Sequence, residues 1–111
     1  MIPRPGTLAL LALFASAGLV PPAPASGAGT GHEVRIEGMK FVPARIEVPR
    51  GDTVTWVNQD VVPHTVTAQK AGLESGQIDH DKRWTYKASK AGEIPYVCRF
   101  HPGMRGILVV K

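Results

Sequence analysis

Residues 45–58, with the sequence RIEVPRGDTVTWVN, decide the fold class of this chain. Charged and apolar side chains alternate over residues 45–48, which is the two-residue period of a half-buried strand. Residues 53–58 are rich in β-branched types and place a valine and Trp56 on one face, as strands do. The segment PRGD at residues 49–52 is a turn signal. Two short strands joined by a tight turn predict an all-β domain.

The same alternation continues in both directions from this hairpin-like segment. Residues 70–82 are polar and contain glycines, so we expect a loop or a short irregular strand there, and no segment has a convincing helical period. About seven short strands in one small domain predict a Greek-key β-sandwich or barrel. The further strands are predicted at residues 32–39, 64–68, 83–88, 94–98 and 106–111.

The first 25 residues are predicted to be a signal peptide. Arg4 supplies a positive start, residues 8–20 are an uncharged apolar run, and residues 23–25 (APA) match the small-residue pattern before a cleavage site. The alternatives are a membrane-spanning helix, which needs about 20 apolar residues, or an uncleaved anchor. We therefore predict a signal peptide at 1–25, a flexible linker at 26–31 and a folded domain at 32–111.

The charge pattern and the predicted export limit the functions that we expect. The net charge of +4 falls to +3 when residues 1–25 are removed, and lysines and arginines are spread without a run of like charge. This pattern gives no reason to expect nucleic-acid binding, and a removed signal peptide leaves no stable membrane insertion. We expect a periplasmic or secreted monomer.

The single cysteine, Cys98, excludes a disulfide within the chain. Disulfides are the usual fate of cysteines in exported proteins, so a lone thiol has two explanations. It is either a buried structural cysteine or a metal ligand. The residues that follow Cys98 favour the metal.

A thiol, an imidazole and a thioether lie close together in the segment YVCRFHPGMRG, at Cys98, His101 and Met104. All three are soft or borderline ligands, and blue-copper sites combine two histidines and one cysteine with a weak axial methionine. A tight Pro-Gly loop between the histidine and the methionine would return both to the cysteine. This segment therefore predicts three of the four ligands of a copper site. Zinc is an alternative, but methionine gives no reason to choose it.

The fourth ligand has to come from another segment. His64 is the best candidate, because it follows the apolar loop VVP and opens a predicted strand. Strands that are distant in sequence lie side by side in a sandwich, which would bring His64 to the Cys98–Met104 loop. His80 lies in a polar stretch and His32 near the predicted start of the domain, so neither is expected to bind metal.

The chain resembles the cupredoxins, and most closely the amicyanin and plastocyanin group. The resemblance implies a Greek-key β-sandwich and one type 1 copper ion bound by His64, Cys98, His101 and Met104. It also implies one-electron transfer in a periplasmic or extracellular space. The short gaps between the last three ligands are similar to those of amicyanin. The matching motifs are FVP at 41–43, IEV at 46–48, GDTVTWVN at 51–58, PHTV at 63–66, YVC at 96–98 and MRG at 104–106.

Thr65 departs from the family pattern, which has an asparagine directly after the first histidine ligand. The Thr65 hydroxyl is a candidate to support the site in its place, and the alternative is that Thr65 is an ordinary strand residue. The resemblance also implies an apolar docking patch for redox proteins around Pro63, His101 and Pro102, to which Val61, Val62 and Gly103 would contribute.

Two functional classes remain open at this stage. The first is a type 1 copper protein that shuttles single electrons between a donor and an acceptor. The alternative is a periplasmic copper-binding or delivery protein, for which the same ligands would serve. An enzyme is not expected, because copper enzymes built from such domains need further ligands and the chain has no His-x-His pair.

Overall fold

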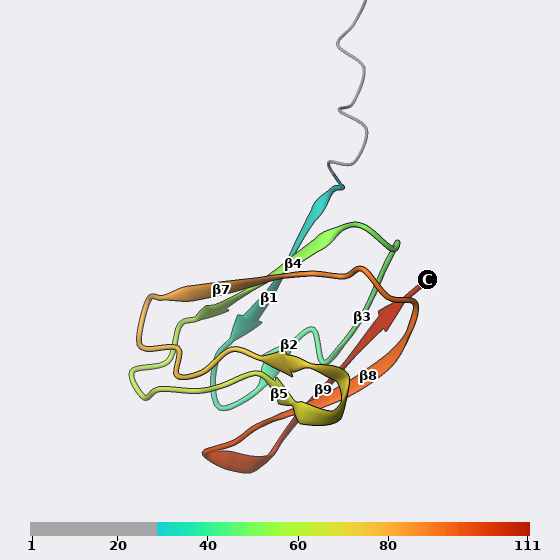
Figure 1. Cartoon of the computed structure of the whole chain (residues 1–111). Coiled ribbons are helices and arrows are strands. Elements are labelled where there is room, and N and C mark those ends of the chain that lie inside the picture. Colours follow the sequence, from blue (N-terminus) through green and yellow to red (C-terminus); the bar gives the residue numbers. More distant parts are fainter. Residues whose placement is uncertain (1–28) are drawn as a thin grey trace, which may run out of the picture.

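Two β-sheets pack against each other in the part of the chain that the computed structural model describes, residues 29–111 (Figure 1). The predicted signal peptide and residues 26–28 of the predicted linker lie outside the described residues. The first sheet has the strand order β2 (Phe41–Val42), β1 (Gly31–Ile36), β4 (Thr53–Asn58) and β7 (Arg83–Lys87).

The second sheet carries the long C-terminal strands. Its order is β3 (Arg45–Val48), β9 (His101–Val110), β8 (Gly92–Cys98), β5 (Thr67–Ala68) and β6 (Leu73–Glu74), and one 3-10 turn, η1 (Gln69–Ala71), joins β5 to β6. The pairs β1–β4 and β3–β9 are parallel, whereas the other pairs are antiparallel. Parallel neighbours cannot be joined by a hairpin, so the chain crosses repeatedly between the sheets. The predicted β-sandwich is confirmed.

Aromatic side chains from both sheets fill the core. Trp56 of β4 is fully buried and its Nε1 donates a hydrogen bond to the Tyr96 Oη of β8 at 3.2 Å. The Phe41 ring packs edge-on against Tyr96 with 4.8 Å between ring centroids. Burial raises the pKa of Tyr96 to about 12, although the bond from Trp56 opposes this. Trp84 and Tyr86 are half-buried and pack against the edge of this core.

The predicted strands agree best with the structure where alternation is strongest. The bounds of β3 and β4 are as predicted, and β1 begins at Gly31, one residue before the predicted start of the domain. The predicted strand over 64–68 is wrong in extent. Only β5 is a strand, and His64 forms an isolated bridge with Ile78. The next two N–H groups, of Thr65 and Val66, bond the side chains of Cys98 and Ser75 in place of a neighbouring strand.

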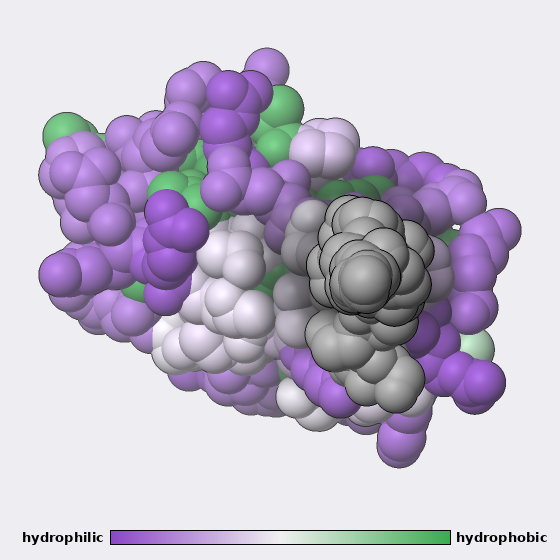
Figure 2. Space-filling model, turned by 90° about the horizontal axis from the view of Figure 1, so that it is seen from above, coloured by the Kyte–Doolittle hydropathy of each residue, from purple (hydrophilic) through white to green (hydrophobic). Residues whose placement is uncertain are grey.

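The described residues seen in Figure 2 are mainly hydrophilic, with hydrophobic residues in small separate areas. Within residues 29–111 no helix is long and apolar enough to cross a membrane.

Candidate metal centre

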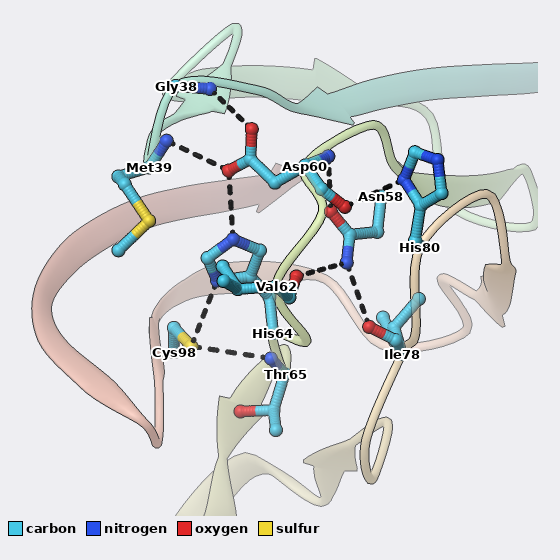
Figure 3. A network of polar contacts seen from close by, with 10 residues as sticks. All are labelled: Gly38, Met39, Asn58, Asp60, Val62, His64, Thr65, Ile78, His80 and Cys98. Carbon is cyan, nitrogen blue, oxygen red and sulfur yellow. Dashed lines mark hydrogen bonds and ion pairs between the residues drawn. The ribbon is translucent and has the colours of Figure 1, made fainter.

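The four predicted ligands come from two segments that the sandwich brings together. Cys98 ends β8 and His101 begins β9, and the two residues are paired in register across the turn between the strands. Met104 follows on β9 and is buried. His64 approaches from the loop after β4, and its Nδ1 lies 3.7 Å from the Cys98 Sγ (Figure 3). The tertiary fold thus joins positions that are far apart in the sequence.

His64 is held rigidly at its backbone. It is completely buried and exchanges two backbone hydrogen bonds with Ile78, at 3.1 Å and 2.8 Å. Its ring lies 5.2 Å from the His101 ring between centroids, in an edge-on arrangement. His101 is partly exposed, so the site has one buried imidazole and one that reaches the surface.

The Nε2 of His64, on the far side of the ring from Cys98, contacts a carboxylate. The Asp60 Oδ2 lies 2.9 Å from this nitrogen. Asp60 also accepts hydrogen bonds from the backbone N–H groups of Gly38 at 2.8 Å and Met39 at 3.0 Å. Burial raises the pKa of Asp60, but the hydrogen bonds from Met39, Gly38 and His64 outweigh it and hold the pKa below its usual value of 3.8. Asp60 is therefore an ionised hydrogen-bond acceptor at neutral pH.

Asn58 fixes the loop that carries Asp60 and His64. This fully buried side chain donates to the carbonyl oxygens of Val62 at 2.8 Å and Ile78 at 2.9 Å, and it accepts from the Asp60 N–H at 2.8 Å (Figure 3). The Asn58 amide therefore uses both its N–H₂ group and its oxygen in these three hydrogen bonds. Because an unpaired buried amide is costly, Asn58 selects one conformation of the loop.

Thr65 links the two ligand-bearing segments. Its backbone N–H donates to the Cys98 Sγ at 3.3 Å, and its Oγ1 accepts from the Arg99 N–H at 2.8 Å. A polar chain continues from Thr65 Oγ1 to Thr67 Oγ1 at 2.9 Å and on to Glu74 at 3.1 Å, where the Arg99 guanidinium also pairs. The threonine hydroxyl thus reaches the second segment by accepting from the Arg99 backbone N–H, and it also bonds the hydroxyl of Thr67.

Replacing Thr65 with valine should lower the free energy of unfolding by about 1–3 kcal/mol, the cost of leaving a buried polar group unpaired. The variant keeps the shape of the side chain but leaves the Arg99 N–H without its acceptor. Urea unfolding of the metal-free protein measures the change.

Thr55→Val is the matched control for this substitution. Thr55 also lies on a strand and also bonds a threonine hydroxyl, that of Thr85 at 2.8 Å, but the pair is exposed. Water can replace that bond, so the change should stay within about 0.5 kcal/mol. Equal effects at Thr55 and Thr65 would contradict a role for Thr65 in joining the segments.

The donor set fits a soft metal, although the side chains are not gathered into a closed cluster. Among residues 29–111, no three His, Cys, Asp or Glu side chains together form a metal-binding group. The close pair is His64 and Cys98, with His101 beside the His64 ring, and Met104 is buried on β9, three residues after His101. One thiol, two imidazoles and one thioether match the preference of copper.

The remaining histidines have other partners. The His32 Nε2 pairs with Asp52 at 2.8 Å, and the His80 Nδ1 contacts the Asp60 backbone oxygen at 2.9 Å while its Nε2 pairs with Asp81 at 3.2 Å. Neither contacts the Cys98 sulfur in the described residues. His80 nevertheless belongs to the network behind His64, through its contact with the Asp60 backbone oxygen, and no local pattern in the sequence indicates this.

Asp60 and Asn58 are the site residues that sequence reasoning missed. The only signal was a carboxylate four residues before His64. A carboxylate at such a position is usually exposed to solvent. No pattern in the neighbouring residues indicates that the Asp60 side chain turns inward.

Known proteins resemble this chain over most of the described domain. The cupredoxin-like domain family matches residues 7–110. Amicyanin of Paracoccus denitrificans is 34% identical over 83 residues, which cover 70% of this chain and 63% of that protein. Chloroplastic plastocyanin of Tetradesmus obliquus is 33% identical over 84 residues, covering 64% of this chain and 58% of that protein. The chain therefore spans somewhat less than two thirds of these relatives.

Solved structures agree with the sequence relatives. An oxidised mutant of amicyanin superposes with a TM-score of 0.68 at 34% identity, and the match covers 79% of this chain and 86% of that one. The chain that carries the two-sheet fold and the candidate ligands is thus similar to amicyanin in both sequence and structure. The chain belongs to the cupredoxin-like family.

Proposed function

We propose that this protein is an exported type 1 copper protein that transfers single electrons between redox partners, with His64, Cys98, His101 and Met104 as the ligands. The observation that carries this proposal is the contact between the His64 Nδ1 and the Cys98 Sγ. It joins a distant histidine to the cysteine–histidine–methionine segment. Solved amicyanin structures described as the Cu(I) form support copper as the metal.

The protein's part is to hold the ligands in one arrangement. A bound copper ion supplies reversible exchange of one electron between Cu(I) and Cu(II). The Thr65 N–H donates to the Cys98 Sγ and helps to fix the position of that sulfur. The buried Asn58 and the backbone bridge of His64 limit movement of that ligand, and hydrogen bonds and an apolar surrounding of this kind tune the metal's potential.

Partner docking is proposed at the surface around His101. The large hydrophobic side chains that are exposed in residues 29–111 lie beside the ligand-bearing segments, and Val61 is the most exposed, at 83%. Weak electron-transfer encounters use small interfaces, and a patch of this kind would suit one. Pro63, Pro102 and Gly103 adjoin it in sequence. The exposed hydrophobic residues are Met39, Val61, Val62 and Phe100.

We infer a periplasmic or secreted monomer that is not an enzyme. Export is supported by the apolar run and cleavage pattern in residues 1–25, with the domain proposed at residues 32–111. The second candidate function is copper binding and delivery in copper homeostasis. It is favoured by the partly exposed His101, through which a partner could reach the metal.

Copper titration of the purified domain tests the proposal. One equivalent of Cu(II) should produce an intense visible band from thiolate-to-copper charge transfer, and repeated reduction and reoxidation should restore it without loss of metal. A domain that gives no such band would contradict the copper site. Rapid loss of Cu(I) to a chelator, in place of reversible cycling, would favour delivery over electron transfer.

A further inference from the structure

We propose that Thr67 and Glu74 are positioning residues of the metal centre. Through a ring of hydrogen bonds they hold the turn between Cys98 and His101 in one arrangement, in the metal-free protein as well as with the metal bound. This inference rests on the proposed function for the identity of the metal. The arrangement of the turn can nevertheless be tested without copper.

The turn between β8 and β9, which joins two of the proposed ligands, is attached to other segments through both the backbone and the side chain of Arg99. The Arg99 N–H donates to the Thr65 Oγ1 at 2.8 Å, and its guanidinium pairs with the carboxylate of Glu74 on the edge strand β6. The Thr65 and Thr67 hydroxyl oxygens lie 2.9 Å apart, and Thr67 reaches the same carboxylate at 3.1 Å. These contacts close a ring that begins and ends at Arg99.

The hydroxyl protons of this ring have a fixed direction. A threonine hydroxyl has one proton to donate, and an ionised carboxylate only accepts hydrogen bonds. The Thr67 hydroxyl donates to the Glu74 Oε2, so the Thr65 hydroxyl has to donate to Thr67. The Thr65 oxygen then accepts from the Arg99 N–H. The chain of donors therefore runs from the ligand turn to the carboxylate, and its order depends on the pure acceptor at the end.

The buried hydroxyls contribute more to this ring than the ion pair does. Thr65 and Thr67 are buried, and a buried hydroxyl that loses its partner is costly. The side chains of Arg99 and Glu74 are 52% and 35% exposed, and ion pairs at such positions contribute little. Thr65 also donates its backbone N–H to the Cys98 Sγ (Figure 3). A shift of Thr65 would therefore reach a proposed ligand directly.

The Glu74 carboxylate is itself held in place. Its Oε2 also accepts from the Gly76 N–H at 3.1 Å, and Gly76 has a φ of 72°, which favours glycine. A carboxylate has enough lone pairs for the three donors that reach it, from Thr67, Gly76 and Arg99. The ring thus ends at a fixed acceptor and not at mobile solvent.

Two substitutions of Thr67 separate a hydrogen-bonding role from a packing role in the metal-free protein. Thr67→Val keeps the shape and removes the hydroxyl, whereas Thr67→Ser keeps the hydroxyl and removes a methyl group. Without its acceptor, the buried Thr65 hydroxyl should turn away and release the Arg99 N–H. Hydrogen exchange at the Arg99 amide should become about 5–30-fold faster in Thr67→Val, the factor for losing an ordinary hydrogen bond. It should stay close to the wild-type rate in Thr67→Ser.

The chemical shift of the Arg99 amide proton reports the same bond without depending on the stability of the fold. In Thr67→Val this resonance should move upfield, as expected when a hydrogen bond is lost, and in Thr67→Ser it should stay near its wild-type position. An unchanged resonance in Thr67→Val, or a larger change in Thr67→Ser than in Thr67→Val, would overturn the proposal.

Glu74→Leu removes the acceptor at the end of the ring, and Glu47→Leu is its matched control. Glu47 also lies on the second sheet and pairs with an exposed arginine, Arg45, at 2.6 Å, and its other partner is the C-terminal Lys111. With one equivalent of Cu(II), the wild-type protein and Glu47→Leu should each give one set of EPR hyperfine lines. Glu74→Leu should give broadened or additional lines, because the turn adopts more than one arrangement. Equal spectra in the two variants would refute a role for Glu74.

The metal-free measurement separates the ring from the identity of the metal. A protein that binds no copper but shows the expected changes at Arg99 would contradict only the proposed function. A protein that binds copper and shows no change at Arg99 in Thr67→Val would contradict only the role of the ring. Circular dichroism establishes that each variant is folded. If Thr67→Val does not fold, the Arg99 amide is measured in Glu74→Leu, where the same upfield shift is expected and its absence would refute the proposal.

Discussion

Replacing Cys98 with serine is expected to remove the intense visible band entirely and to abolish most of the stabilisation that copper gives. The hydroxyl of serine is a harder and much less acidic ligand than a thiol, so it cannot supply the charge-transfer band or the same affinity. At a copper concentration of 1,000 times the dissociation constant, the wild-type domain should gain about 4 kcal/mol in the free energy of unfolding.

That gain in stability is measured by urea unfolding with and without copper, next to the visible spectrum. Serine keeps an acceptor for the Thr65 N–H, so the metal-free variant should remain folded. Met39→Leu is the control, because it removes a sulfur that is 41% exposed and outside the proposed ligand set. A Cys98→Ser variant that keeps the band, or a Met39→Leu variant that loses it, would contradict the ligand assignment.

Trp56→Ala should cost the metal-free domain about 3–5 kcal/mol, the usual range for truncating a buried large aromatic side chain. Trp56 is completely buried and donates to Tyr96. Its ring also packs against the rings of Tyr96 and Trp84, at 5.5 Å and 5.7 Å between centroids. Small domains have total stabilities of about 5–15 kcal/mol, so this loss is a large share of the total and the unfolding midpoint of the variant should fall markedly.

Trp84→Ala provides the comparison for the core. Trp84 pairs directly with Trp56 across β4 and β7, but it is half-buried at the edge of the core. Its removal leaves a space that water can enter, so the loss of stability should be clearly smaller. Equal losses from the two substitutions, measured by urea and thermal unfolding, would show that Trp56 is not the central residue of the core.

Local patterning explains which parts of the fold could be predicted. The alternation in Arg45–Val48 and Thr53–Asn58 gave correct bounds for β3 and β4, because a half-buried strand imposes its period on its own residues. The two-residue strand Phe41–Val42 was not predicted, and for residues 70–82, which contain the strand Leu73–Glu74, the sequence left a loop or a short irregular strand open. A strand that short has no period, and it exists only because a neighbouring strand offers backbone partners.

The strand expected over residues 64–68 was wrong in extent for a related reason. The apolar and polar residues alternate there, but the backbone of His64 bonds Ile78 in an isolated bridge. The buried Asn58 fixes the preceding loop through Val62 and Ile78. These bonds depend on segments that are distant in sequence, so no local window contains them.

The sequence by itself determined the all-β class and the four candidate ligands, since strand period and ligand chemistry are properties of individual residues and their spacing. Only the tertiary structure decided that His64 presents Nδ1 to Cys98 and Nε2 to Asp60. It also decided that Thr65 joins the two segments through the Arg99 backbone. Hydrogen-bond partners are chosen by the packing of the two sheets, and this packing brings together residues that the sequence keeps apart.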